Sequence, residues 1–274
     1  MRLSSKIGSF FSRILLAVLV FLTLVPFYLM IVNSLKNAAG IIQEPFSIPR
    51  VLYLINYIKA FPQVLRPMLN SLIVTAAIIV ITCLFSLFAA YAFARFKFFM
   101  KEVLYFGIIA LMMIPGFVLL IPQFIQVNNL GLYDTYAALI LVPAAYQVAF
   151  GTMLIRTSIE SISNSLFESA LLEGANDMQI IRYIVLPMSK PILATVSIMT
   201  GLSSWNNYIW PLVASSSENT RQIAVALNQI VYNAAQGKGV ELAGYVCASL
   251  PIVILFCIAS KSFIEGLSQG AVKG

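Results

Sequence analysis

Six long apolar stretches that contain no Asp, Glu, Lys or Arg dominate the sequence. They cover about residues 14–33, 70–94, 103–125, 136–155, 192–214 and 242–259. A bilayer core is roughly 30 Å thick, and about 20 apolar residues in a helix cross it. Because only helices and closed barrels satisfy their backbone polar groups in lipid, each stretch predicts a transmembrane helix. We therefore expect an all-α membrane protein with six transmembrane helices in one domain, residues 1–274.

The composition also favours a lipid environment. Hydrophobic residues make up 60% of the chain and charged residues 10%, and the mean hydropathy is +0.93. A soluble domain carries about 25% charged residues. The net charge of +7 does not indicate nucleic acid, because Lys and Arg lie at the ends of the apolar stretches, as membrane topology predicts.

Three absences narrow the function. The sequence has no G-x-x-x-x-G-K-[ST] phosphate-binding loop, so we expect no ATP binding by this chain. The apolar stretches carry none of the ionisable residues that proton-coupled carriers use as relays. The sequence has no histidine, and Cys83, Cys247 and Cys257 lie in apolar runs without a C-x-x-C pair. We expect a non-catalytic protein without cofactor or metal, whose driving energy comes from a partner.

The distribution of Lys and Arg predicts the orientation. If the N-terminus is cytoplasmic, the inside segments hold 11 basic residues and the outside segments hold 6. This bias and the even number of spans predict that both termini are cytoplasmic. The basic start resembles a signal peptide, but the apolar run Ile14–Val32 has 19 residues, longer than a usual h-region, and predicts a retained span.

The longest predicted inside loop, residues 156–191, begins with a short helix. Ser165 and Glu168 have the spacing of a capping box, with Ser165 as the N-cap. The helix is expected over residues 166–173, and Gly174 can end it in a left-handed conformation.

A second short helix is predicted in the same loop. Asn176 offers its N-cap, and the helix is expected to run toward Val185. Pro187 is expected to stop it, since proline removes a backbone donor and restricts the residue before it.

This helix pair carries apolar side chains into the cytoplasm, namely Leu166, Phe167, Leu171 and Leu172. An apolar helix face in a polar loop usually packs against something. One interpretation is packing against the helix ends of the same chain. The other is docking into the groove of a partner protein.

The loop also resembles that of bacterial ABC importer permeases. The run Glu168-Ser169-Ala170, then Gly174, then Ile184-Val185-Leu186-Pro187 is similar to the family pattern Glu-Ala-Ala…Gly…Ile-x-Leu-Pro. Ser169 replaces the second family residue, and Glu173 stands where Asp is common. The resemblance implies a role in coupling to an ATPase for Ser165, Leu166, Phe167, Glu168, Ser169, Ala170, Leu171, Leu172, Gly174, Ala175, Ile184, Leu186 and Pro187.

The resemblance covers almost the whole chain and is nearest to the sugar-transporting class, the smaller six-helix permease of the maltose type. It implies a type I ABC importer permease fold, with a cytoplasmic two-helix coupling loop between helices 4 and 5, in the bacterial plasma (inner) membrane. The motifs that carry it are Asn70-Ser-Leu72, Ala89-Ala-Tyr-Ala-Phe-Ala-Arg95, Met113-Ile-Pro-Gly116, Gly131-Leu-Tyr-Asp-Thr-Tyr136, Trp205-Asn-Asn-Tyr-Ile-Trp-Pro211 and Gly270-Ala-Val-Lys-Gly274.

The resemblance also implies partners. These are a second homologous permease, an ATPase dimer that binds ATP and Mg, an extracellular or periplasmic solute-binding protein, and a carbohydrate-like solute. It further implies that residues 216–239 reach toward the solute-binding protein and that residues 268–274 contact the ATPases. A stand-alone channel or secondary carrier is the alternative, but it leaves the cytoplasmic helix pair unexplained.

The fifth apolar stretch is the most polar near its outer half. Amide, hydroxyl and aromatic groups suit hydroxyl-rich ligands, so a substrate pathway is one interpretation. Hydrogen bonds between helices and anchoring at the membrane interface are the alternatives. The candidate pathway residues are Ser203, Ser204, Asn206, Asn207 and Tyr208.

Overall fold

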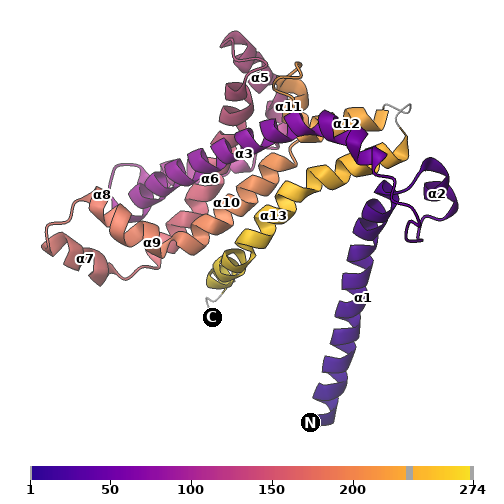
Figure 1. Cartoon of the computed structure of the whole chain (residues 1–274). Coiled ribbons are helices and arrows are strands. Elements are labelled where there is room, and N and C mark those ends of the chain that lie inside the picture. Colours follow the sequence, from indigo (N-terminus) through magenta and orange to yellow (C-terminus); the bar gives the residue numbers. More distant parts are fainter. Residues whose placement is uncertain (1, 233–236, 272–274) are drawn as a thin grey trace. The chain divides into compact units, whose positions relative to one another are not determined.

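The computed structural model describes the backbone of residues 2–232 and 237–271, and the side chains of residues 12–230 and 237–257. Throughout this part of the chain the regular elements are helices (Figure 1). The all-α class predicted from the apolar stretches is therefore confirmed.

The chain forms two compact units. The first comprises Met1–Arg66 and Ala226–Leu250, and the second comprises Pro67–Val225 and Pro251–Gly274. The candidate site lies in the second unit.

In the first unit, α1 (Arg2–Ser34) includes a candidate span over Ser12–Ser34, and α2 (Ala38–Gln43) follows it. The end of α12 (Ile223–Tyr232), the start of α13 (Lys238–Ala271) and the first residues of α3 (Ile55–Arg95) also belong to this unit. The segment after α1 is held by the buried Lys36, whose Nζ donates to the backbone oxygen of Glu44 at 2.6 Å.

The helix α3 (Ile55–Arg95) begins well before residue 70, where the second span was expected. The charges of Lys59 and Arg66 and the loop-forming residues Pro62 and Pro67 ended the apolar pattern. The helix nevertheless continues through both prolines. The predicted outer loop is correspondingly shorter.

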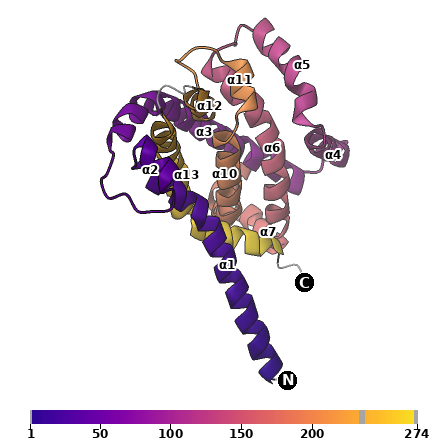
Figure 2. The ribbon, with the colours of Figure 1, turned by 90° about the vertical axis from the view of Figure 1, so that its right-hand side faces the viewer.

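The third predicted span is bent. The helices α4 (Lys101–Met112) and α5 (Gly116–Asn129) meet at an angle of 97°, and Figure 2 shows α5 leaving α4 sharply. Pro115 lies at this bend as the N-cap of α5. Proline lacks an N–H and disfavours a helical residue before it, which accounts for the break inside the predicted span over residues 103–125.

The fifth predicted span is also divided, into α10 (Lys190–Trp205) and α11 (Ile209–Ala214). The helix α6 (Tyr136–Glu160) matches its prediction closely. Four helices are long and apolar enough to cross a membrane alone, and up to six spans result if each bent pair counts as one. The described residues thus hold four to six candidate spans.

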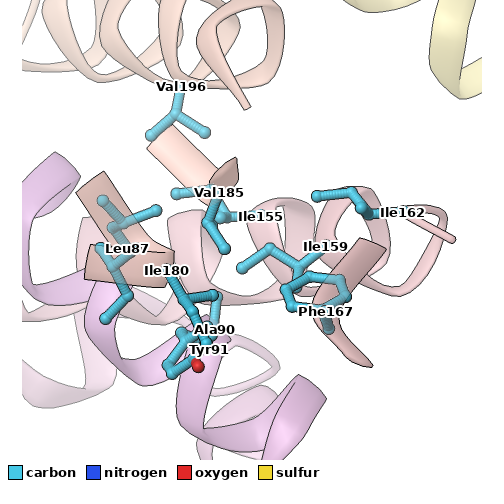
Figure 3. Packing of buried hydrophobic residues seen from close by; sticks show 11 residues of the cluster. Leu87, Ala90, Tyr91, Ile155, Ile159, Ile162, Phe167, Ile180, Val185 and Val196 are labelled. Atoms are coloured by element: carbon cyan, nitrogen blue, oxygen red, sulfur yellow. The ribbon is translucent and has the colours of Figure 1, made fainter. Parts of the chain in front are cut away.

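Two buried apolar clusters stabilise the second unit. One lies among α3, α6, α10 and the helical segment that precedes α10, and Figure 3 shows it with the Phe167 ring beside Ile159. The other joins α3, α5, α6 and α11 through residues such as Ile78, Leu139 and Trp210. Each end of α6 is therefore packed against a different set of helices.

Candidate functional site

The first helix of the predicted coupling loop, α7 (Asn164–Leu172), begins earlier than expected. Its N-cap is Ser163, and no side chain caps its first turn. Ser165 lies inside that turn, and its hydroxyl is 2.8 Å from the hydroxyl of Ser163. The predicted capping box of Ser165 with Glu168 is therefore wrong, because the helix starts too early for Ser165 to accept from its third amide.

Gly174 ends α7 as predicted. Its φ is +82°, in the left-handed region that favours glycine. The amide of Gly174 donates to the carbonyl of Leu171, and the amide of Ala175 donates to the carbonyl of Ala170, both at 3.0 Å. These are the two hydrogen bonds of a Schellman motif, which satisfies the last carbonyls of the helix.

Asn176 caps the next helix, as predicted. Its Oδ1 accepts from the amide of Gln179 at 2.9 Å, and Gln179 Oε1 accepts from the amide of Asn176 at 2.8 Å. The two contacts form a reciprocal capping box at the start of α8 (Asp177–Ile180).

The helical segment does not stop at Pro187, so that expectation is wrong. It passes through a π-helical turn, Ile181–Val185, into α9 (Leu186–Met188), and the break comes at Ser189. Pro187 lies in the first turn of α9, where a missing N–H costs least. The segment Asp177–Met188 then meets α10 at 75°.

Phe167 is buried and does not point outward. Its side chain is 1% exposed and packs in the cluster with Ile159 and Ile162. The guanidinium of Arg95 lies over its ring, 3.8 Å from the centroid. The prediction that Phe167 docks into a partner is therefore wrong, and for this residue packing against the chain's own helix ends is correct.

The other apolar residues of α7 remain accessible. Leu172 is 90% exposed and Leu171 is 57% exposed. Of the remaining predicted coupling residues, Ser165, Leu166, Glu168, Ser169, Gly174, Leu186 and Pro187 are exposed, whereas Ala170, Ala175 and Ile184 are half-buried. The pair of helices thus has one side packed on the bundle and an apolar side that faces outward.

The end of α3 holds both halves of this helix pair. Arg95 Nη1 donates to Asn164 Oδ1 at 2.7 Å, and the hydroxyl of Tyr91 donates to Asp177 Oδ1 at 2.8 Å. The contacts join residues more than 60 positions apart in sequence, so spacing along the chain gave no signal for them.

A cavity of about 350 Å³ lies among α5, α6, α10 and α11. Ser203 and Asn207 line it, together with the amides of Gln123 and Gln147 and the hydroxyl of Tyr146. Gln147 Nε2 donates to Ser203 Oγ at 2.9 Å, and Gln123 Nε2 donates to the Tyr146 hydroxyl at 2.7 Å. Gln123, Tyr146 and Gln147 were not among the predicted pathway residues, although an amide inside an apolar span is itself a signal for a polar function.

The three other candidate pathway residues lie away from this cavity. The hydroxyl of Ser204 is buried between α10 and α3, 2.9 Å from the hydroxyl of Thr75. Asn206 is exposed and donates to the backbone oxygen of Leu202 at 2.9 Å, and Tyr208 is the half-buried N-cap of α11.

The predicted contact segments are described only in part. In the segment 216–239, residues 233–236 lie outside the described residues. In the tail 268–274, the backbone is described only to residue 271, and its side chains are not described.

Comparisons with known proteins agree on one kind of protein. The model of a family described as "Binding-protein-dependent transport system inner membrane component" matches residues 83–272. A probable ABC transporter permease protein of Bacillus subtilis, YurM, is 37% identical over 252 residues, covering 91% of this chain and 83% of the relative. The arabinooligosaccharides transport system permease protein AraQ of Halalkalibacterium halodurans is 30% identical and covers 100% of this chain and 99% of its own.

A solved structure shares the fold. It is that of a bacterial ABC transporter involved in the import of the acidic polysaccharide alginate, with a TM-score of 0.82 and 24% identity. The match covers 95% of this chain and 98% of the other. A second structure, of a bacterial alginate ABC transporter in complex with an alginate pentasaccharide-bound periplasmic protein, has a TM-score of 0.66 and 14% identity.

Proposed function

Because the chain belongs to the family of binding-protein-dependent transport system inner membrane components, and is thus a non-catalytic permease of an ABC importer, we propose that it couples to a separate ATPase through residues 156–191. We also propose that it forms half of a pathway for a carbohydrate. A solute-binding protein delivers the solute. The ATPase binds ATP and Mg and hydrolyses the ATP, and a second permease completes the pathway.

The exposed apolar side of the α7–α9 segment carries the coupling proposal. Leu171 and Leu172 are exposed although the helix has a packed side formed around Phe167. Fully burying one leucine side chain stabilises a contact by about 1.5–3 kcal/mol. Two exposed leucines on a short helix pair therefore suit an apolar groove on another protein.

The basic residues at this end of the helices support a cytoplasmic position for the coupling loop. Arg95, Arg156 and Arg182 belong to the helix ends and loops there. Cytoplasmic segments are enriched in Lys and Arg. In the proposed orientation the coupling loop and both chain termini are on the ATPase side of the membrane.

The polar cavity supports the pathway proposal. Its lining offers amides, hydroxyls and the faces of aromatic rings, and no Asp, Glu, Lys or Arg. Such groups suit neutral, hydroxyl-rich ligands by hydrogen bonding and stacking. The resemblance to the arabinooligosaccharides transport system permease protein AraQ favours the same class of solute.

The test compares Leu172→Asp with Glu173→Gln in the complete transporter. Leu172→Asp places a charge in the proposed apolar contact, so we expect the ATPase to be lost when the tagged permease is purified. Glu173→Gln is the matched control next to it, because Glu173 is also exposed and its change adds no charge. Normal ATPase recovery with Leu172→Asp, or solute uptake by the permease without any ATPase, would overturn the proposal.

A further inference from the structure

Two sequence motifs with no role in coupling or in the cavity meet the chain that follows Trp210 at one end of the second unit. They are the 70–72 motif and the 131–136 motif. Hydrogen bonds from both motifs reach residues 215–222, called here the 215–222 loop. This end of α6 is its N-terminal end, whereas the coupling loop follows its C-terminal end (Figure 1).

Asp134 holds the first half of the 215–222 loop. Its Oδ1 accepts from the amides of Ser216 at 3.1 Å and Ser217 at 3.2 Å, and also from the hydroxyl of Thr220. The backbone at Asp134 is left-handed, with φ of +59°, and its amide donates to the carbonyl of Ala214 at 3.0 Å. A single carboxylate oxygen therefore binds three donors of the loop.

Asn70 holds the second half. It is buried, and its Nδ2 donates to the backbone oxygens of Asn219 and Arg221, each at 2.9 Å. Its Oδ1 accepts from the hydroxyl of Tyr136 at 2.8 Å, which fixes the orientation of the amide. The neighbouring Ser71 Oγ accepts from the amide of Ile223 at 2.9 Å and ends the loop.

The loop presents polar side chains on this fixed backbone. Ser216, Glu218 and Asn219 are exposed, whereas Thr220 and Gln222 are buried. A loop of this length without anchors samples many conformations, and ordering each residue costs free energy when a partner binds. Here the ordering is achieved by the permease itself, which is the general basis of preorganised binding.

We propose that Asp134 and Asn70 are positioning residues that hold the 215–222 loop in the conformation engaged by the solute-binding protein. The inference rests on the proposed function and on the expectation that residues 216–239 reach toward this partner, and it adds the two residues that fix the shape of the loop. It assigns a physical role to two motifs that resemble the family but that neither coupling nor the cavity explains.

Two observations favour the solute-binding protein over the ATPase and the bilayer. The loop lies at the opposite end of α6 from the coupling loop, and a helix of 25 residues separates those ends by about 37 Å. Residues 215–220 are Ser, Ser, Ser, Glu, Asn and Thr, without the Trp or Tyr that anchor loops in a membrane interface. A polar, hydrated protein surface is the partner that such a loop fits.

The experiment uses the complete transporter in lipid nanodiscs and its solute-binding protein as purified. The variants are Asp134→Gly, which keeps the left-handed backbone but removes the carboxylate, and Asn70→Asp, which sets a carboxylate against two carbonyls. We expect each to raise the concentration of solute-binding protein that half-stimulates ATPase activity by about tenfold, since loop ordering now opposes binding. The maximal stimulated rate is expected to stay the same, which a general structural defect would not allow.

A second readout reports on the loop directly. With Cys83, Cys247 and Cys257 replaced by alanine, a spin label at Glu218→Cys is expected to be immobile in the parent protein and mobile in both variants. Asn128→Ala, an exposed residue at the end of α5, is the control that leaves both readouts unchanged. If a variant does not assemble, Thr220→Val is tested with the same two readouts. This change removes one hydrogen-bond donor to Asp134 and keeps the volume of the side chain nearly the same.

Unchanged half-stimulation and unchanged label mobility in the assembled variants would overturn this inference and leave the importer assignment intact. A parent transporter whose ATPase activity does not respond to any solute-binding protein would instead contradict the proposed function. The two failures are therefore distinguishable.

Discussion

The guanidinium of Arg95 at the end of α3 lies 3.8 Å from the ring centroid of Phe167 on α7. The same guanidinium donates to Asn164 at the start of α7. Because the ring is buried in the bundle, this contact connects a long helix of the bundle to the helix pair that we propose as the ATPase contact. We therefore expect movement of α3 to be transmitted to α7 through this contact.

Arg95→Lys is expected to weaken coupling while the charge is retained. A lysine has a compact ammonium in place of the planar guanidinium, so it cannot stack on the ring and donate to Asn164 at the same time. A cation–π contact contributes about 0.5–1 kcal/mol at exposed sites and about 2 kcal/mol when desolvated. We expect transport per ATP hydrolysed to fall several-fold in proteoliposomes, with normal ATPase recovery. Lys97→Arg, in the loop that follows α3, is the control, and an unchanged transport ratio in Arg95→Lys would contradict the role of the contact.

Gly174→Val is expected to distort the end of α7. A side chain at φ of +82° is strained even though the space around a Cβ there is open. The left-handed conformation costs a non-glycine residue roughly 1–2 kcal/mol, and more for a β-branched one. We expect uncoupled or reduced ATPase stimulation, measured with the purified complex. Gly174→Asn is the matched control because asparagine tolerates this conformation, so equal loss in both variants would argue against the turn.

Asn176→Ala is expected to destabilise the second helix of the coupling loop, whereas Glu168→Ala leaves both helices unaffected. Only Asn176 takes part in a capping box in the structure. Loss of such a cap costs about 0.5–2 kcal/mol. Hydrogen exchange of residues 177–180 is the measurement, and faster exchange is expected in Asn176→Ala alone. Faster exchange there in Glu168→Ala would show that Glu168 supports the segment by a contact that this structure lacks.

Gln147→Leu is expected to reduce solute uptake without changing assembly. The change removes the amide that donates to Ser203 and that lines the cavity, and it leaves a side chain of similar size. We expect a higher half-saturating solute concentration, or a lower maximal uptake, for an oligosaccharide substrate in proteoliposomes. Thr82→Val, in α3 and away from the cavity lining, is the control. Wild-type uptake by Gln147→Leu would exclude this cavity as the pathway.

Acid is expected to release the 215–222 loop. The Thr220 hydroxyl, with the amides of the loop, lowers the pKa of Asp134 to about 2 from 3.8. Because the folded-state pKa is the lower one, the contribution to stability is complete above pH 3.8 and is lost as the pH falls through about 2. The spin label at residue 218 should therefore stay immobile from neutral pH to about pH 4 and become mobile as the pH falls further toward about 2.

Asp134→Asn isolates the contribution of Asp134, because its amide oxygen accepts hydrogen bonds but does not titrate. We expect the acid-induced rise in mobility to be much smaller in that variant. An equal rise in both proteins would show that Asp134 is not the cause of the acid-induced release.

Local features of the coupling loop could be predicted from the sequence. The left-handed turn at Gly174 and the cap at Asn176 depend on hydrogen bonds between residues at most five positions apart. Short sequence motifs are sufficient to predict such local hydrogen bonds. The prediction of Ser165 as the N-cap was wrong, because the loop contains several serines that could occupy this position and Ser163 occupies it in the structure. The apolar spans were likewise visible, since their length and lack of charge are properties of the sequence alone.

The sequence by itself determined that the chain is helical and embedded in the membrane. An apolar, charge-free stretch of about 20 residues is unfavourable in water whatever it packs against. Only the tertiary structure decided that Phe167 turns inward under Arg95 while Leu172 stays outside, although both are apolar residues of one short helix. It also brought Asn70, Asp134 and Thr220 together across 150 residues of sequence. The physical reason is that burial and hydrogen bonding between distant segments depend on which helix faces meet, and periodicity within one helix does not specify its neighbours.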